Sequence, residues 1–318
     1  MDFVLPHVLA APMAGGPSTP ELVDAVSFGF LAFGTCSVDD ARAQLARTTG
    51  DYGVNLFSEQ TEKPEDTDVE SIAAELGVEV PTADLTCGYP AKFAAVLDAI
   101  DAGRGPRVVS TMFGCFPETD IQALHERGVE AWVNVTNPED ALTATQRGAD
   151  KLVVQGPNAG GHRGTWSITA EPDWRSLPEL FAAVREVTDL PLIAAGGVRT
   201  SSDIAQLIEF GAVAVMCGSA FLLADEAGTS EFNRELLAAG GSSTSTRAFS
   251  GRYARGLETT FTREHPDMPA IYPYLNAMLK PRRSDLDFAY CLVGEPAAQL
   301  HAGSAKGIEQ RLLGTLEV

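Results

Sequence analysis

Eight short apolar runs, rich in β-branched residues, alternate with longer amphipathic segments along this chain of 318 residues. This alternation is typical of parallel strands joined by helical crossovers. We expect strands over residues 8–11, 30–33, 52–55, 108–112, 131–135, 151–155, 191–194 and 213–216. Eight parallel strands, each followed by a helix, predict an α/β fold of the (β/α)8 TIM barrel type with a C-terminal extension.

Glycine residues mark the expected ends of several helices. Each stands just after an amphipathic segment, where a left-handed residue commonly ends a helix, and precedes a hydrophobic residue that would open the next strand. These pairs are Gly77-Val78, Gly128-Val129, Gly148-Ala149 and Gly211-Ala212. One of the helices is expected to begin behind Ser201 to Asp203, whose side chains offer N-cap oxygens.

Two segments depart from the alternation. Residues 58–67 are acidic and polar, include Pro64, and are expected to form a loop insertion. After Phe221 the pattern changes to a Gly/Ser/Thr stretch and then to a tail with several arginines. We therefore expect a barrel core over residues 1–225 and a C-terminal extension over residues 226–318. The extension would serve as a lid, a cap or a subunit contact, and a subunit contact would make the protein a homodimer.

Charge and cysteine content narrow the class of protein. Lys plus Arg number 23 against 43 Asp plus Glu, and the resulting net charge of −20 repels nucleic acids and anionic membranes. The cysteines are scattered and never in CxxC spacing, which argues against disulfides and a thiolate metal site: Cys36, Cys87, Cys115, Cys217 and Cys291. With no basic leader and no apolar stretch long enough for a bilayer, the expected location is the cytoplasm.

The loops after the last two expected strands are rich in glycine. They contain Gly196-Gly197 and the run Cys217-Gly218-Ser219, and each leads into a helix. Glycines let backbone N–H groups approach an anion, and the last two loops of a barrel commonly hold a phosphate. The alternative is that these glycines only permit tight turns.

The loop after the sixth expected strand carries a histidine among glycines. It runs from Gln155 to Gly164, and the backbone of Gly156, Gly160 and Gly161 could pass close beside a flat ligand. His162 stands in this loop, and its ordinary pKa near neutrality suits proton abstraction or stabilisation of negative charge. The alternative is a structural, hydrogen-bonded histidine.

Further side chains near strand ends are candidate ligand contacts or nucleophiles. Asn55 ends the third expected strand, and a buried amide needs partners that a flavin edge or a phosphate would provide. Met13 ends the first strand and is expected to lie near the same ligand. Cys36, Cys115 and Cys217 also lie near strand ends, but a cysteine nucleophile is disfavoured because no histidine stands beside any of them in sequence, although pairing in space with His162 stays open.

Four stretches of the sequence resemble motifs of the nitronate monooxygenases, formerly called 2-nitropropane dioxygenases. APMAGGPSTPELVDAVSFGFLAFG resembles the first motif of the family, VVQGPNAGGHRGTW its histidine motif, and LPLIAAGGVRTSSDIAQLIEFGAVAVMCGSAFL its phosphate-binding end. TRAFSGRYARGL resembles the C-terminal motif of the bacterial class I branch. The resemblance covers most of the chain.

The resemblance implies an FMN-dependent (β/α)8 enzyme. It would oxidise an alkyl nitronate, a small anionic substrate such as propionate 3-nitronate, with dioxygen to a carbonyl compound and nitrite. His162 would be the catalytic residue. The FMN contacts would be Met13, Asn55, Gln155, Gly156, Gly160, Gly161, Gly196, Gly197, Met216, Cys217, Gly218 and Ser219.

The sequence departs from the family pattern near the histidine. Asn158 stands where an acidic residue is usual, and the missing carboxylate would remove one influence that could raise the pKa of His162. Trp166 replaces a commoner Phe, while Ser219 replaces a frequent Thr and keeps the hydroxyl. We further expect Arg163, with Arg247 or Arg252, to make the mouth of the site locally positive.

Two other functions remain open from the sequence. A flavin-dependent NAD(P)H:quinone or enoyl-thioester reductase would share this barrel and similar glycine loops. A flavin-free barrel that binds another phosphate compound would need the same loops and no redox chemistry. No metal is expected in any of these cases.

Overall fold

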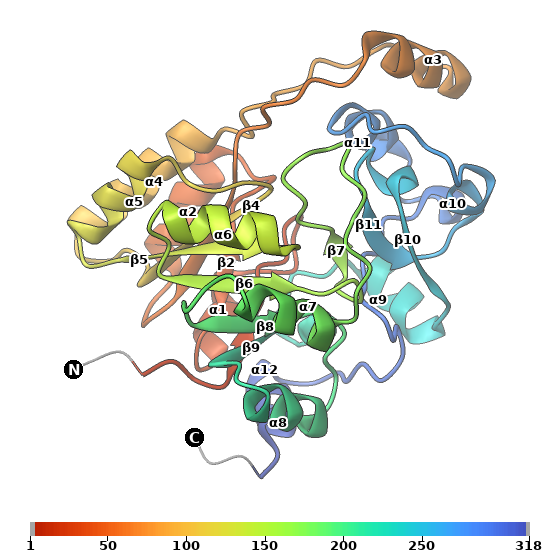
Figure 1. Cartoon of the computed structure of the whole chain (residues 1–318). Coiled ribbons are helices and arrows are strands. Elements are labelled where there is room, and N and C mark those ends of the chain that lie inside the picture. The colour runs from red at the N-terminus through yellow and green to blue at the C-terminus, as the bar shows by residue number, and fades with distance from the viewer. Residues whose placement is uncertain (1–3, 316–318) are drawn as a thin grey trace.

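The computed structural model describes residues 4–315 and contains an eight-stranded parallel sheet. The strands follow the order β1-β9-β8-β6-β5-β4-β3-β2, and a parallel bridge between Ala10 and Gly29 brings β1 back beside β2. The sheet is therefore curled into a barrel (Figure 1). Its strands are β1 (Val8–Ala10), β2 (Phe30–Ala32), β3 (Gly53–Phe57), β4 (Val108–Met112), β5 (Glu130–Val135), β6 (Lys151–Gln155), β8 (Leu192–Ala195) and β9 (Ala214–Cys217).

The predicted barrel is confirmed, and all eight expected strands are present. β4 and β6 have the expected bounds, and most of the others differ by one residue at an end. The largest difference is in β3, which runs on to Phe57 because Leu56 and Phe57 pair with Thr111 and Met112 of β4. Asn55 therefore lies inside β3 and not at its end.

Helices cover the outside of the barrel (Figure 1). They are α1 (Pro20–Ala25), α2 (Val38–Arg47), α4 (Tyr89–Asp101), α5 (Glu118–His125), α6 (Pro138–Gln146), α7 (Leu177–Arg185), α8 (Ser201–Glu209) and α12 (Ala305–Leu313). Their apolar faces form one core with the outer side of the strands. A second core fills the barrel, where Phe28, Phe30 and Trp132 pack ring against ring.

The expected helix ends are largely confirmed. Gly77, Gly128, Gly148 and Gly211 all have positive φ angles, between 67° and 103°. A strand follows each of them except Gly77, where the prediction of a following strand was wrong. The N-cap of α8 is Thr200, one residue before the expected group, and its hydroxyl accepts a hydrogen bond from the N–H of Asp203.

An arm formed by residues 58–88 leaves the barrel between β3 and α4. The expected loop over residues 58–67 is correct at its start, but α3 (Asp66–Leu76) begins within it. Figure 1 shows α3 standing away from the barrel beside α11 (Tyr274–Leu279). Val69 and Ala73 of α3 are buried in an apolar cluster with Leu275 and Met278 of α11. The arm thus connects the barrel to the C-terminal part of the chain.

The chain between β9 and α12 forms an inserted segment, which we define as residues 225–302. It contains α9 (Glu231–Ala239), β10 (Ser243–Thr246), β11 (Ala254–Leu257), α10 (Thr260–Glu264) and α11, together with three short 3-10 helices, Arg247–Phe249, Lys280–Arg282 and Leu286–Phe288. β11 pairs on one side with β10 and on the other with β7 (Gly161–His162), both antiparallel. The short strand of the histidine loop and two strands of the inserted segment therefore form one small sheet.

The last helix returns to the barrel. α12 packs beside α1 and α8, and Glu309 accepts a hydrogen bond from the N–H of Ser27 at 2.9 Å. The division into a core up to residue 225 and an extension after it stays a prediction. What the structure shows is that α12, within the expected extension, packs as one of the barrel helices.

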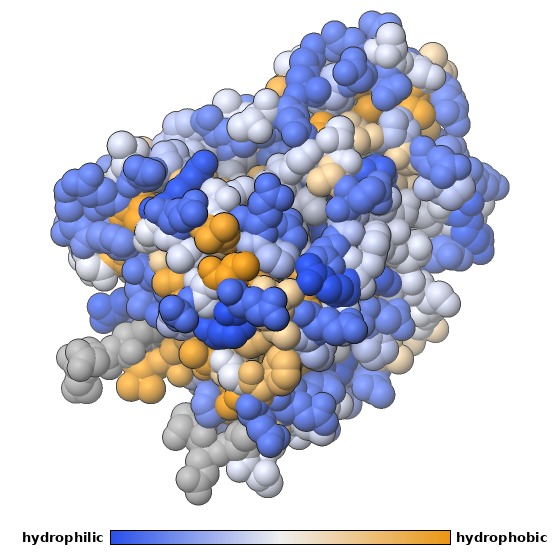
Figure 2. All heavy atoms as spheres, viewed as in Figure 1, coloured by the Kyte–Doolittle hydropathy of each residue, from blue (hydrophilic) through white to orange (hydrophobic). Residues whose placement is uncertain are grey.

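The surface on the face shown in Figure 2 is predominantly hydrophilic, with hydrophobic residues in separate small groups. Large exposed hydrophobic side chains are spread over several elements and include Val80 in the arm, Leu142 in α6 and Phe210 after α8. No helix within residues 4–315 is long and apolar enough to cross a membrane.

Candidate active site

A cavity of about 480 Å³ lies at the carboxyl ends of the barrel strands. The structure brings almost all the sequence-predicted site residues together in its lining: Met13, Asn55, Gln155, Gly160, Gly161, His162, Gly196, Gly197, Met216, Cys217, Gly218 and Ser219. Gly156 is the exception. Its N–H donates to Ala195 O at 2.8 Å, and a Cβ there would lie 2.8 Å from Leu177 Cβ, so this glycine serves packing against α7.

The loop after β8 has a conformation that requires glycine. Gly196 and Gly197 have φ angles of 114° and 79°, in the region that other residues rarely adopt. A Cβ on Gly197 would also lie 2.8 Å from Asn158 Cβ and 3.0 Å from Glu295 O. The tight-turn explanation therefore holds for these glycines, and the same turn presents their backbone to the cavity.

The loop after β9 is joined to the inserted segment. The Ser219 hydroxyl accepts a hydrogen bond from the N–H of Gly294 at 2.9 Å and keeps its own hydrogen for another acceptor. A Cβ on Gly160 would lie 2.4 Å from Gly294 N and 2.7 Å from the carbonyl carbon of Val293. Three backbone segments therefore meet at this corner of the cavity without room for a side chain.

The floor of the cavity is polar, and several of its groups lack a protein partner. Asn55 Nδ2 donates to Ser110 Oγ at 2.9 Å. Thr111 Oγ1 and Asn134 Oδ1 are buried, and no group within residues 4–315 forms a hydrogen bond with either atom. Buried polar atoms are nearly always paired, so these atoms indicate a polar ligand. Sequence reasoning missed Ser110, Thr111 and Asn134, although polar residues within buried strands were a visible signal.

His162 is held on β7 at the wall of the cavity. Its Nε2 lies 2.8 Å from Ser250 Oγ, and the rings of Phe113 and Tyr272 meet the imidazole edge-on, with centroids 5.6 and 5.4 Å away. Burial, with smaller contributions from the cations Arg252 and Arg283, lowers the pKa of His162 to about 3. The imidazole is therefore neutral at physiological pH.

The side chain of Gln155 fixes the backbone of the histidine loop from His162 to Gly164. Its Nε2 donates to the carbonyl oxygen of His162 at 3.0 Å, and its Oε1 accepts from the N–H of Gly164 at 2.8 Å. Gln155 was predicted to contact a cofactor. It does line the cavity, but both ends of its amide bind the histidine loop, so one N–H is left for a ligand.

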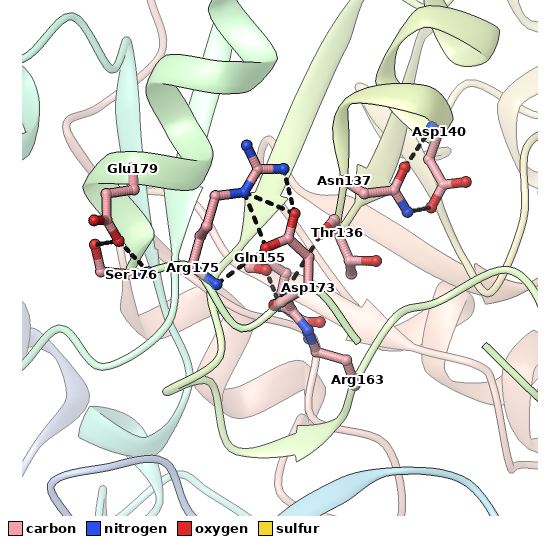
Figure 3. Close-up of polar contacts among 9 residues, drawn as sticks. All are labelled: Thr136, Asn137, Asp140, Gln155, Arg163, Asp173, Arg175, Ser176 and Glu179. Carbon is pink, nitrogen blue, oxygen red and sulfur yellow. Dashed lines mark hydrogen bonds and ion pairs between the residues drawn. The ribbon is translucent and has the colours of Figure 1, made fainter. Parts of the chain in front are cut away.

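Arg163 anchors the loop to the barrel rim (Figure 3). Its guanidinium donates to the backbone carbonyls of Gln155, Thr136 and Asp173, which lie at the end of β6, after β5 and before α7. The Asp173 carboxylate is engaged by Arg175 instead. The prediction that Arg163 contributes to a positive mouth was wrong. Its side chain is buried, and its guanidinium donates its hydrogen bonds to backbone carbonyls.

The other two arginines of the expected mouth are also placed elsewhere. Arg252 is only 1% exposed, and Arg247 pairs with Glu171 at 3.2 Å on the surface. The cations that line the cavity are instead Arg199, Lys280 and Arg283, and the latter two belong to the inserted segment. Cations do line the cavity, but they are residues that sequence reasoning did not single out for this role.

Asn158 and the cysteines add little to the chemistry of the site. Asn158 is exposed and lies against Gly197, and the charges that act on His162 come from arginines. Cys217 lines the cavity, but burial raises the pKa of its thiol to about 12. A thiolate nucleophile at Cys217 is therefore disfavoured at neutral pH.

Comparison with known proteins identifies the family. The nitronate monooxygenase family model matches residues 1–313. The chain belongs to the nitronate monooxygenase family. A nitronate monooxygenase from Pseudomonas aeruginosa is 30% identical over 92% of this chain and 90% of its own, and one from Paraburkholderia phytofirmans is 32% identical over 84% and 78%.

Solved structures agree with this family. A nitroalkane oxidase from Streptomyces ansochromogenes superposes with a TM-score of 0.85 at 33% identity, over 96% of this chain and 94% of that one. FabK from Thermotoga maritima shares the fold, with a TM-score of 0.73 at 24% identity, over 96% of this chain and 91% of that one. Membership of the nitronate monooxygenase family supports an oxidoreductase that acts on nitronates.

Proposed function

We propose that the protein binds FMN and uses dioxygen to oxidise alkyl nitronates to a carbonyl compound and nitrite. One observation carries this proposal: a neutral histidine at the wall of a cavity that is also lined by glycine backbone and by the cations Arg199, Lys280 and Arg283. A nitronate is an anion before it binds. The site therefore needs groups that place the anion, and it does not need a base to form it.

The residues of the barrel fit a phosphorylated flavin. The backbone of the Gly196-Gly197 loop, the N-terminal end of α8 and the Ser219 hydroxyl would hold the phosphate. Asn55, Thr111 and Asn134 offer amide and hydroxyl groups to a ring with polar edges, and two of them have buried oxygens that need a partner. When bound, FMN would supply the redox chemistry that the oxidation of a nitronate by dioxygen requires.

The inserted segment provides the positive charge for an anionic substrate. Lys280 and Arg283 line the cavity, and the Arg283 guanidinium donates to Asn276 Oδ1 while its face lies 3.7 Å from the centre of the Tyr290 ring. Burial lowers the pKa of Arg283, so the group gains by pairing with an anion. The nitronate would lie between these cations and His162.

His162 has a different task for each form of the substrate. With a nitronate, its neutral ring can donate one hydrogen bond to the anion, while Ser250 holds the other nitrogen. With a neutral nitroalkane, the ring must instead accept the α-proton. The low pKa of His162 favours the first task.

An anaerobic titration tests the proposal. The purified protein should show flavin absorbance, bleach with propionate 3-nitronate and recover in air, with nitrite and an aldehyde as products. Bleaching by NADH or NADPH but not by the nitronate would favour a reductase instead. A colourless protein that takes up no added FMN would favour a barrel that binds another phosphate compound.

A further inference from the structure

Arg252 lies behind the histidine, outside the lining of the cavity. Its guanidinium donates to the carbonyl oxygen of Thr165 in the histidine loop and, at 2.6 Å, to Gln60 Oε1 in the arm. Both acceptors are uncharged, and the side chain is 1% exposed. A buried cation without a hydrogen-bonded carboxylate is costly, so its retention requires a reason.

The same guanidinium supports the two rings that flank the histidine. Its central carbon lies 4.2 Å from the centre of the Phe113 ring and 5.6 Å from that of Tyr272, at distances typical of cation–π contacts. Phe113 has a φ angle of 71°, a conformation that a bulky residue adopts only when its surroundings impose it. Arg252 thus joins the arm, the β4 loop, the histidine loop and the inserted segment around His162.

The charge of Arg252 acts on the imidazole. Burial lowers the pKa of Arg252 to about 10, which leaves it charged at neutral pH; Tyr272, Cys87 and Glu62 act on it less strongly than burial does. The groups that face His162 are Ser250, Phe113, Tyr272 and two cations, Arg252 and Arg283. No carboxylate is among the groups that act on His162 there, so a second positive charge on the imidazole is opposed.

We propose that Arg252 is a positioning residue that packs Phe113 and Tyr272 around His162 and keeps the imidazole uncharged, so that the site selects the ionised nitronate over the neutral nitroalkane. The selection rests on the function proposed above. To use a nitroalkane, the site must break its α C–H bond, leave the electron pair on the nitroalkane as nitronate and place the proton on His162. That step creates an imidazolium beside Arg252, whereas binding a ready-made nitronate does not.

Two variants separate charge from shape. Arg252→Lys keeps the positive charge and loses the flat, forked group, while Arg252→Gln loses the charge and keeps an N–H donor for Thr165. The exposed Arg127→Gln is the matched control, since Arg127 pairs with Asp101 on the surface. The charge of His162 is followed by proton–nitrogen NMR of histidine-labelled protein as a function of pH, with His162→Asn to assign the signal. The kcat/KM values for a nitronate and its parent nitroalkane are measured alongside.

Burial is the larger cause of the low pKa of His162, so Arg252→Gln should raise that pKa only part of the way toward its ordinary value of about 6.5. It should also raise the nitroalkane-to-nitronate ratio of kcat/KM by about tenfold or more. Arg252→Lys and Arg127→Gln should leave the titration and the ratio near those of the wild type. If Arg252→Gln does not fold, as judged by thermal melting, Arg252→Met takes its place as the uncharged variant.

A folded, uncharged variant in which His162 titrates as in the wild type would overturn the proposal, as would Lys and Gln variants that titrate alike. If the wild-type protein oxidises neither nitronate nor nitroalkane, the proposed function fails and the substrate selection fails with it. The NMR titration would still decide whether Arg252 sets the charge of His162.

Discussion

The barrel gives the cavity glycine backbone and the polar side chains of its strands, whereas the inserted segment gives it cations and an aromatic ring. On the barrel side, Gly196, Gly197 and Gly218 line the cavity with main chain. On the other side stand Tyr272, Lys280 and Arg283. Gly196 and Gly197 have positive φ angles and little room for a Cβ, so they cannot change without damage to the fold, whereas side chains of the inserted segment can change while the barrel stays intact. Under the proposed function, the barrel is the cofactor side and is constrained, and the inserted segment is the substrate side and can vary.

His162 lies where the two sides meet, and its removal should have the largest effect. His162→Asn should lower kcat/KM for a neutral nitroalkane by about 10²–10⁴-fold, because the proton acceptor is lost. The loss with a nitronate should be smaller, and the flavin should stay bound because the barrel side is untouched. Stopped-flow reduction of the flavin by the two substrate forms measures both effects. Equal losses for the two forms would contradict the separation of tasks.

Two glycines that line the cavity should respond in opposite ways to alanine. Gly160→Ala forces a Cβ against Gly294 N and should lower the free energy of unfolding by about 1–3 kcal/mol. Gly218→Ala has only ordinary contacts, 3.5 Å or longer, so its stability should hold while its affinity for FMN falls. Urea unfolding and flavin titration measure the two quantities. An unchanged free energy of unfolding for Gly160→Ala would show that the backbone around Gly294 can move enough to accommodate a methyl group.

A cation on the substrate side should affect binding more than turnover. Lys280→Met should raise the KM for an anionic nitronate by about tenfold, with little change in kcat and a weaker dependence of kcat/KM on salt. Arg247→Met is the control, because Arg247 pairs with Glu171 at the surface and such pairs contribute about 0–1 kcal/mol. If Arg247→Met changed the salt dependence of kcat/KM, Arg247 would after all attract the anionic substrate to the site, contrary to its position in the structure.

The smallest expected effect concerns stability in acid. The folded protein holds the pKa of His162 near 3, below its ordinary value, so in mildly acidic solution the unfolded chain binds a proton that the folded protein does not. The free energy of unfolding should therefore fall as the pH falls, by about 1 kcal/mol more in the wild type than in His162→Asn between about pH 6 and about pH 5. Asp140 acts in the opposite direction, since burial raises its pKa to about 7, but it does so in both proteins. If the free energy of unfolding depended on pH in the same way in the wild type and in His162→Asn, His162 would take up its proton in the folded protein as it does in the unfolded chain.

The barrel and its glycine loops were accessible from the sequence because they rest on local rules. Strand and helix periodicity predicted the eight strands, and glycines predicted the ends of α3, α5, α6 and α8. The same locality placed His162 and most of the predicted contacts in one cavity. The prediction that Gly156 lines the cavity was wrong, because this glycine is needed for close contact with Leu177, which is distant in sequence.

The substrate side was not accessible because it depends on pairings between distant residues. The pairing of Ala254 with His162 follows from no local pattern, and it decides that Ser250 meets the imidazole while Arg252 lies behind it. The three arginines first assigned to the mouth were chosen by charge alone. Burial and the geometry of carbonyl groups decided their actual places.

The parallel bridge between Ala224 and Gly303 brings the two ends of the inserted segment together. Asp225 N donates to Gly303 O at 2.9 Å, so the chain departs from the barrel and rejoins it at a single point. A stretch of nearly eighty residues can therefore be exchanged as a module between related barrels, by two splices at neighbouring positions. We expect the substrate specificity of such a chimera to follow the protein that supplies the inserted segment, and its affinity for the cofactor to follow the protein that supplies the barrel.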